Sequence, residues 1–495
     1  MAEPVDFTLA AGEHIAIVGP NASGKSMLVD IITGAHPLMG ERVEYDFNEG
    51  LAHFGKSENQ APHKSTRSNL VSDNIKYITF RDTYSEGDRN YYLQQRWNQT
   101  EIDDDAPTVG SVLETAFLRS GTDTPERRDL QQHLYDVFQL RHLLDKPMVC
   151  LSSGELRKFV LCRTLLAAPR VLIMDNPFIG LDKPTRQQVR EVMQTLSTEH
   201  DLQIILILAK DEDIPHFISH VVPVRSMVVL PKVTREEYLN RNATVPSVTA
   251  SPFDTQQVCE EIRQLPVNTP FSLDEVVKLS KVSIRYGDRT ILKDLDWTVS
   301  NGERWALSGQ NGAGKSTLLS IICADNPQSY ACDVSLFGRK RGSGESIWDI
   351  KRHIGYVSPE MHRAYHRDMP ALRIVASGLK DSVGLHVKPT PEEYATCRMW
   401  MRIMGIAHLE ERSFLKMSSG EQRLVLLARA FVKDPTLLIL DEPLHGLDHA
   451  RSTHVKALIE AFCQRPGKTL IMVTHYEEEL PSCITHRLHL HRVLE

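Results

Sequence analysis

The chain has 495 residues, enough for one to three domains at about 150 residues each. It carries 57 lysines and arginines against 64 aspartates and glutamates, a formal charge of −7, which argues against a surface dominated by nucleic-acid contacts. With 41% hydrophobic and 24% charged residues, the composition also excludes a disordered chain, a collagen-like repeat and a coiled-coil rod.

The chain shows no sequence signal for the membrane or for secretion. Its longest apolar run, residues 204–209, is far shorter than the ~20 residues that a membrane-spanning helix needs. The first residues lack the basic and apolar regions of a signal peptide. The eight cysteines are scattered and form no Cys-x-x-Cys pair, which argues against zinc or a disulfide framework. We therefore expect a cytoplasmic protein with reduced thiols.

The first predicted elements enclose a glycine-rich loop. An apolar strand is expected at 15–18 and an apolar helix at 27–32, and the residues between them fit the pattern G-x-x-x-x-G-K-[ST]. The same order returns in the second half, with a strand, loop and helix at 305–308, 309–316 and 317–323. Such a loop between a strand and a helix is typical of a phosphate-binding site.

Three further motifs of the first half recur in the second half at one constant offset. They are Leu/Met-Ser-Ser-Gly-Glu at 151–155 and 417–421, an apolar strand ending in Asp at 171–175 and 437–441, and Gly-Leu-Asp at 180–182 and 446–448. Because β-rich runs alternate with helical segments in each half, we predict an α/β fold with two P-loop NTPase domains in tandem, each with a mostly parallel sheet.

The predicted domains are residues 1–230 and 276–495. Residues 231–275 between them contain five prolines, four basic and seven acidic residues. This composition predicts a linker with at most one short helix, near residues 256–264.

The loop residues suit the binding of a nucleoside triphosphate. Glycines let backbone N–H groups turn toward anionic oxygens, and the following helix adds its partial positive charge. Lys25 and Lys315 are expected to reach the β- and γ-phosphates, while the hydroxyls of Ser26 and Ser316 are expected to ligate Mg²⁺. The sequence therefore predicts a nucleoside triphosphate with Mg²⁺ in each half.

The order of these motifs, followed by Thr474-His475, resembles the ATP-binding cassette (ABC) ATPase family twice over. The resemblance covers nearly the whole chain except the linker. It implies two ABC-type nucleotide-binding domains that pair head to tail, with each ATP held between the phosphate loop of one and the Ser-Ser-Gly-Glu signature of the other. It also implies that the protein is an ATP hydrolase.

This resemblance assigns the binding residues one by one. The nucleotide would contact Gly19, Asn21, Gly24, Lys25, Ser26, Tyr286, Gly309, Asn311, Gly312, Gly314, Lys315, Ser316 and Thr317, and, from the two signatures, Ser153, Gly154, Ser419 and Gly420. The Mg²⁺ ligands would be Ser26, Asp175, Ser316 and Asp441.

The two implied sites are unequal. Asp441 is followed by Glu442, which in the family orients or deprotonates the attacking water, whereas Asp175 is followed by Asn176, which cannot accept that proton. The family's late histidine is present as His475, but the position in the first half is occupied by Lys210. We therefore expect one competent site, with Glu442 and His475 as catalytic residues, and one degenerate site.

The chain departs from the family pattern in three places. Tyr286 stands where the family stacks an aromatic ring on adenine, but only 18 residues precede Gly19, so the first strand and its aromatic residue are expected to be missing. The family's glutamine between the phosphate loop and the signature is replaced by Pro359 in the second half and by Phe80 in the first. Both signatures read Ser-Ser-Gly-Glu rather than Ser-Gly-Gly-Gln.

Residues 336–358 resemble tandem-cassette members of the family that are associated with molybdenum transport. This implies an ATPase that energises separate integral-membrane permease subunits, at the inner face of the cell membrane. An alternative is a soluble factor of the ABC-F type that acts on ribosomes, although such factors have a long basic linker. A soluble ATP switch acting on DNA ranks below both, because no strong nucleic-acid signal is present.

Overall fold

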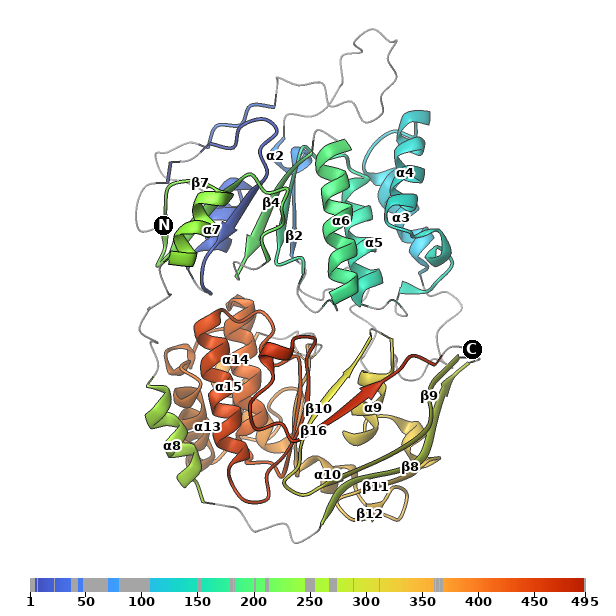
Figure 1. Ribbon diagram of the computed structural model, residues 1–495, viewed down its shortest axis with the longest axis vertical. Helices are drawn as coiled ribbons and strands as arrows, with labels where there is room; N and C mark the ends of the chain where they lie inside the picture. The colour runs from blue at the N-terminus through green and yellow to red at the C-terminus, as the bar shows by residue number, and fades with distance from the viewer. Residues whose placement is uncertain are drawn as a thin grey trace. The chain divides into compact units, whose positions relative to one another are not determined.

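The computed structural model describes residues 5–6, 8–21, 23–36, 43–47, 70–79, 107–148, 151, 153–178, 181, 183–199, 202–209, 213–244, 254–266, 274–287, 289–310, 312–359, 361, 365 and 368–493. These residues form two compact units, one ending at Thr244 and one beginning at Asp254. Each unit is a layered α/β structure, so the prediction of tandem α/β domains is confirmed (Figure 1).

The first unit is built on one sheet with the strand order β2-β3-β4-β1-β5-β6, and β7 also pairs with β5. The strands from β2 to β5 are parallel, whereas β6 and β7 pair with β5 in the antiparallel sense. Their bounds are β1 Ile15–Val18, β2 Ile75–Thr79, β3 Val171–Asp175, β4 Gln203–Leu208, β5 His220–Arg225, β6 Val228–Val229 and β7 Val233–Thr234. The inner strands are continuous apolar runs because helices cover both faces of a parallel sheet.

The second unit contains a five-stranded parallel sheet with the order β13-β14-β15-β10-β16. This order repeats the parallel part of the first sheet strand for strand. A separate antiparallel sheet has the order β12-β11-β8-β9. The bounds are β8 Glu275–Tyr286, β9 Arg289–Ser300, β10 Arg304–Gly309, β11 Asp333–Leu336, β12 Arg339–Lys340, β13 Ile354–Val357, β14 Leu437–Asp441, β15 Thr469–Val473 and β16 His486–Leu490.

Helices surround these sheets. In the first unit they are α1 Lys25–Ile32, α2 Val71–Asn74, α3 Val109–Arg119, α4 Pro125–Val137, α5 Ser153–Leu165, α6 Lys183–Glu199 and α7 Arg235–Thr244. In the second they are α8 Thr255–Gln264, α9 Lys315–Ile322, α10 Ile347–Lys351, α12 Ala371–Ser377, α13 Pro391–Ile403, α14 Ser419–Phe431 and α15 His449–Cys463. In both units the helix that follows the phosphate loop begins at the lysine of that loop.

The segment predicted as a linker contains two helices, so the expectation of at most one was wrong. The expected helix is α8, but α7 is also present and follows directly on β7, which pairs with β5 of the first unit. α8 packs against α15: the thiol of Cys259 donates to the carbonyl oxygen of Ala457, and Glu261 forms an ion pair with Arg402 on α13. The residues directly before 245 and directly after 253 therefore belong to the folded units.

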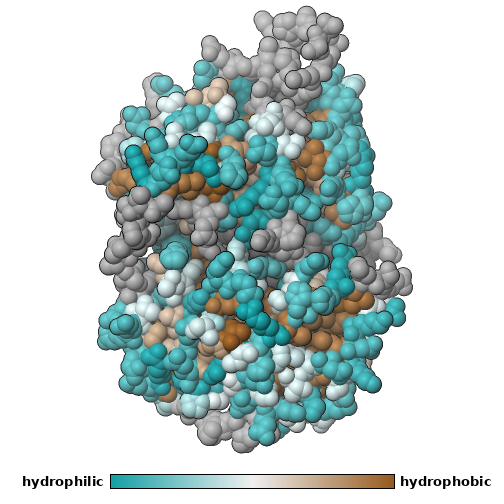
Figure 2. Space-filling view, viewed as in Figure 1, coloured by the Kyte–Doolittle hydropathy of each residue, from teal (hydrophilic) through white to brown (hydrophobic). Residues whose placement is uncertain are grey.

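The surface agrees with the charged composition of the chain. On the face shown in Figure 2, polar side chains predominate and hydrophobic ones lie among them. Within the described part of the chain, no helix combines the length and the apolar composition needed to cross a membrane.

Candidate nucleotide site

The phosphate loop of the second unit runs from the end of β10 to the start of α9. A Cβ on Gly309 would lie 2.5 Å from the carbonyl oxygen of Leu490, so only glycine fits there. Gly314 has a φ of 93° and caps α9, a conformation that favours glycine. The ammonium of Lys315 folds over the loop and donates to the carbonyl oxygens of Gly309 at 2.6 Å and Gln310 at 3.1 Å.

The loop of the first unit repeats this geometry. A Cβ on Gly19 would lie 2.0 Å from the carbonyl oxygen of Val224, on the strand equivalent to that of Leu490. Gly24 caps α1 with a φ of 105°. Lys25 is buried and donates to the carbonyl oxygens of Gly19 at 2.6 Å and Pro20 at 2.7 Å. Both loops therefore hold a lysine ammonium at the centre of a turn made by close backbone contacts.

Both loops fit the phosphates of a nucleotide. The glycine turns leave a concave backbone at the N-terminus of an eight-residue helix, where an anion is stabilised by N–H groups and by the helix dipole. The structure places Asn21, Ser26, Gly312, Ser316 and Thr317 in these loops or in the first helical turns after them. Asn311 lies outside the described residues.

A pair of carboxylates ends β14 in the second unit. Asp441 is the last residue of the strand, and Glu442 follows it with its amide donating to the carbonyl oxygen of Val473 at 2.9 Å. Glu442 is buried, and its Oε1 accepts no hydrogen bond from the described residues. The imidazole Nε2 of His475 lies 3.7 Å from that oxygen. The structure thus brings together the two residues that the sequence predicted as catalytic.

The electrostatics at Glu442 favour a carboxyl group that can hold a proton. Burial, above all, raises the pKa of Glu442 well above its ordinary value, and the charges of Asp441 and Glu479 raise it further. The cations Lys315 and Arg423 oppose this rise in pKa. Such a shift makes this carboxyl group a stronger base than an exposed glutamate.

The corresponding position in the first unit is Asn176. Its amide nitrogen donates to the carbonyl oxygen of Ile207 at 2.8 Å, and its side-chain Nδ2 donates to Oδ1 of Asp175 at 2.7 Å. The hydroxyl of Tyr77 donates to the other oxygen of Asp175 at 3.3 Å. A neutral amide therefore stands where the second unit has a carboxyl group. Lys210 lies outside the described residues.

The residues present fit a magnesium ion in each unit. Asp441 and Asp175 end equivalent strands, and Ser316 and Ser26 begin the helices after the phosphate loops. Carboxylate and hydroxyl oxygens are hard ligands of the kind that Mg²⁺ prefers beside substrate phosphates.

The second signature lies at the start of α14. Ser418 caps this helix: its hydroxyl accepts from the amide of Glu421 at 3.3 Å, and the Glu421 carboxylate accepts from the amide of Ser418 at 2.8 Å. Ser419 and Gly420 are the first two helical residues, so their amides are among those without an intrahelical acceptor. Ser153 and Gly154 begin α5 in the same way.

Two features near these motifs were not predicted from the sequence. The capping box between Ser418 and Glu421 could have been found from its Ser-x-x-Glu pattern before an apolar run. The charge of Arg423, which is buried on α14, lowers the pKa of Glu442. The only sign of this in the sequence is the position of Arg423 one turn after the signature.

Further residues that the sequence singled out lie outside the phosphate loops. Tyr286 ends β8, and its hydroxyl accepts a hydrogen bond from Asn326, whose amide also donates to the hydroxyl of Ser320 on α9. The ring of Tyr286 is thus tied to the helix that follows the phosphate loop. Pro359 follows β13 at the expected place, and Phe80 lies outside the described residues.

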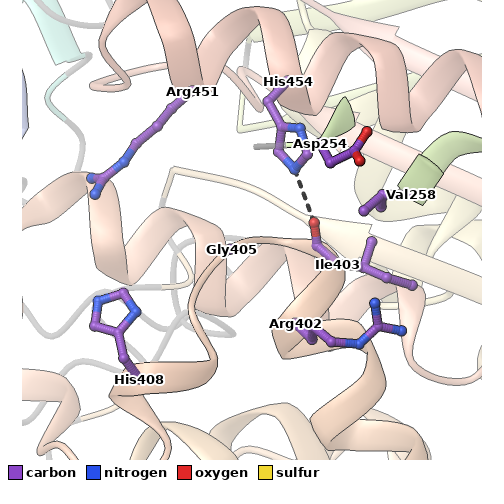
Figure 3. A pocket seen from close by; sticks show the side chains of 8 residues that line it. All are labelled: Asp254, Val258, Arg402, Ile403, Gly405, His408, Arg451 and His454. Atoms are coloured by element: carbon purple, nitrogen blue, oxygen red, sulfur yellow. Dashed lines mark hydrogen bonds between the residues drawn. The ribbon is translucent and has the colours of Figure 1, made fainter. Parts of the chain in front are cut away.

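A cavity of about 390 Å³ in the second unit contains none of these motif residues. Figure 3 shows it between the start of α8, the end of α13 and the first turns of α15. Its lining residues are Asp254, Val258, Arg402, Ile403, Gly405, His408, Arg451 and His454. The cavity marks the place where α8 packs on the helices and is separate from the phosphate loop.

Comparisons with known proteins agree with the repeated motifs. The family model described as ABC transporter matches residues 2–179 and 292–445. The chain is 34% identical to the ABC transporter ATP-binding protein ModF of Escherichia coli over 97% of this chain and 92% of ModF. It is 26% identical to an uncharacterized ABC transporter ATP-binding protein of Schizosaccharomyces pombe over 98% of this chain and 94% of that protein.

Two solved structures have a similar fold over nearly the whole chain. A model of ribosome-bound archaeal Pelota and ABCE1 has a chain that superposes with a TM-score of 0.56, at 17% identity, over 98% of this chain and 74% of that one. The archaeal ribosome recycling factor aABCE1, in complex with a ribosomal stalk protein, gives a TM-score of 0.50 at 17% identity over 97% and 83%. At this identity the likeness concerns the fold alone.

Proposed function

Because the chain belongs to the ABC transporter family and is an ATP hydrolase, we propose that it hydrolyses ATP mainly at the phosphate loop of its second unit. The observation that carries this proposal is the difference between Glu442 and Asn176 at equivalent strand ends. In the second unit a buried carboxyl group lies beside an imidazole, whereas in the first unit an amide occupies the position of that carboxyl group.

In the proposed reaction, Glu442 orients the attacking water and accepts its proton. A general base works best when its pKa lies near the working pH, and burial raises the pKa of this carboxyl toward that range. His475, whose Nε2 lies 3.7 Å from Oε1 of Glu442, would add a donor to the γ-phosphate.

The phosphate loop binds and orients the triphosphate. Lys315 exchanges its bonds to the carbonyl oxygens of Gly309 and Gln310 for phosphate oxygens, and the amides at the start of α9 hold the rest of the charge. Asp441 and Ser316 would hold Mg²⁺, which neutralises charge on the β- and γ-phosphates when bound.

The first unit is proposed to bind ATP and to turn it over slowly. Its loop has the same close contacts and the same lysine geometry, which supports binding. Asn176 cannot take a proton, and its amide is already bonded to Asp175. Loss of a general base costs about 10²–10⁴ in rate.

Each site is proposed to be completed by the signature of the other unit. Ser153 and Gly154 would serve the loop that contains Lys315, and Ser419 and Gly420 would serve the loop that contains Lys25. Both signatures begin long helices, whose free amides suit a γ-phosphate. ATP would then hold the two units together, and hydrolysis would release them.

The partner is proposed to be an integral-membrane permease. The similarity to ModF, which is named an ABC transporter ATP-binding protein, supports this role, and molybdate is the proposed type of cargo. The other role considered, a soluble factor acting on ribosomes, is supported by the layout of two cassettes in one chain. Pro359, which replaces the glutamine that couples to the transport partner in the family, counts against the permease role.

The test is to purify a tagged Glu442→Gln chain from cells in Mg-ATP and to identify its partners by mass spectrometry. This variant should keep ATP bound and the units closed. A Lys315→Ala chain prepared in parallel is the matched control that cannot close at this site. A permease enriched with Glu442→Gln alone supports the transport role, whereas enrichment of ribosomal proteins would replace it with the soluble role.

A further inference from the structure

Two cysteines that are distant in the sequence lie side by side in the second unit. Cys463 is the last residue of α15, and Cys483 lies in the segment that leads into β16. Each thiol shifts the pKa of the other, so the two side chains lie close together, and Ser482 beside Cys483 is hydrogen-bonded to Glu460, one turn before Cys463 on α15. The scattered spacing of cysteines in the sequence gives no sign of this pair.

The backbone on either side of Cys483 is held in place. The amide and the hydroxyl of Ser482 both donate to Oε1 of Glu460 on α15, at 2.6 and 2.9 Å. The amide of Thr485 donates to the carbonyl oxygen of Arg304 on β10 at 2.8 Å, and the Arg304 guanidinium donates to the carbonyl oxygen of Cys463. These bonds fix the relative position of the two cysteines independently of their thiols.

The two thiols differ in exposure and in charge. Cys463 is fully buried, whereas Cys483 is only partly buried at the edge of the same core. The neighbouring thiol of Cys463 lowers the pKa of Cys483, while the pKa of Cys463 is raised by Cys483 and by burial. Cys483 is therefore the thiol that can present a thiolate to a reagent from solvent.

We propose that Cys463 and Cys483 form a reversible disulfide when the protein meets a hydroperoxide. The thiolate of Cys483 attacks the peroxide; an S–O bond forms, the O–O bond breaks, and the leaving oxygen takes a proton. The sulfur of Cys463 then attacks the sulfenic acid, giving up its proton; the S–S bond forms and water leaves. Two electrons pass from the thiols to the peroxide, and a dithiol reductant restores both thiols by exchange.

The disulfide would join the end of α15 to the segment that leads into β16. α15 begins at the cap Asp448 and ends at Cys463, and β16 pairs with β10, which leads into the loop. Because Cys463 lies at the far end of α15 from Asp448, we expect the bond to leave ATP turnover largely intact. It should raise the melting temperature of the oxidised protein, since it restricts the unfolded chain.

The experiment treats the reduced full-length chain with hydrogen peroxide, blocks the remaining thiols by alkylation and maps the peptides by mass spectrometry. We expect a peptide pair linked through Cys463 and Cys483, loss of two titratable thiols, and recovery of both with dithiothreitol. The Cys483→Ser variant should keep its other thiols reduced. The control is Cys332→Ser, since Cys332 is another partly buried cysteine of the same unit, and it should oxidise as the wild type does.

The peptide map of the wild-type protein is sufficient to test the disulfide, even if a variant folds poorly. Alkylation of Cys463 and Cys483 as free thiols after peroxide, or a cross-link that joins other cysteines, would overturn the proposal. Over-oxidation of Cys483 to sulfinic acid without a cross-link would also overturn it, because a neighbouring partner thiol should react first. None of these outcomes depends on which phosphate loop hydrolyses ATP.

Discussion

Asn176 and Glu442 have the same backbone conformation at equivalent strand ends but carry different chemistry. Their φ angles are 49° and 52°, and each donates its amide to the neighbouring strand, to Ile207 in one unit and Val473 in the other. A left-handed φ is costly for residues other than glycine and often marks a functional position. The backbone of each unit therefore places a side chain at the same position after the strand, but only the side chain in the second unit can act as a base.

Removal of the carboxyl group tests this difference directly. The Glu442→Gln variant should lose about 10²–10⁴ in ATP turnover while retaining ATP binding, because the amide keeps the shape but accepts no proton. Steady-state phosphate release and binding of a fluorescent ATP analogue measure the two effects. The matched change in the first unit, Asn176→Ala, should lower turnover far less. Equal losses from both changes would contradict the assignment of one main hydrolytic site.

The buried carboxyl group should also affect stability in a pH-dependent way. Folding raises the pKa of Glu442 above its ordinary value of 4.5, so the folded state binds more protons than the unfolded state above that pH. Its contribution to stability is fully present below pH 4.5 and is lost as pH rises through the folded-state pKa. Since glutamine does not ionise, Glu442→Gln should melt at a higher temperature than the wild type near neutral pH, with the difference shrinking in acid. Melting curves across pH check this, and a constant difference would contradict it.

The two lysines of the phosphate loops provide a matched pair. Both ammonium groups have the same contacts, to the carbonyl oxygens of Gly309 and Gly19 at 2.6 Å. Lys315→Ala should reduce turnover by about 10²–10³, the range for loss of one group that stabilises a transition state. Lys25→Ala should weaken ATP binding to the first unit and cause a smaller loss of turnover. Turnover and nucleotide stoichiometry distinguish the two, and a larger loss from Lys25→Ala would reverse the proposed roles.

Much of the fold could be predicted from the sequence because its signals are local. Strands at 15–18 and 305–308 are apolar runs that end at glycines, and the loops require glycine wherever a Cβ would meet a neighbouring carbonyl oxygen. The glycine, lysine and serine pattern identifies such a loop without any knowledge of tertiary contacts.

Other features depend on side-chain conformation or on contacts between distant segments, which motif spacing does not encode. The bond between Asn176 and Asp175 depends on a side-chain rotamer, and the approach of Cys483 to Cys463 depends on how the segment before β16 packs on α15. α7 was missed because prolines on either side suggested a linker, yet contact with the sheet overrides composition. The pKa of Glu442 likewise follows from burial by the whole unit.

The attachment of α8 to the second unit rests on a buried histidine. The carbonyl oxygen of Ile403 can only accept, so His454 must donate to it through Nε2, at 2.9 Å (Figure 3). Burial lowers the pKa of His454, so the ring is neutral and Nδ1 accepts from the hydroxyl of Thr255, the first residue of α8, at 2.9 Å.

Thr255→Val should therefore weaken the attachment of α8 by about 1 kcal/mol, the net value of one hydrogen bond, while keeping the shape of the side chain. Urea unfolding followed by circular dichroism measures this loss. Thr453→Val, which removes an exposed hydroxyl from the second turn of α15, is the control and should change stability by less than about 0.5 kcal/mol. If both variants lose the same free energy of unfolding, the bond to His454 does not anchor α8, and its apolar contacts with α15 alone hold the helix.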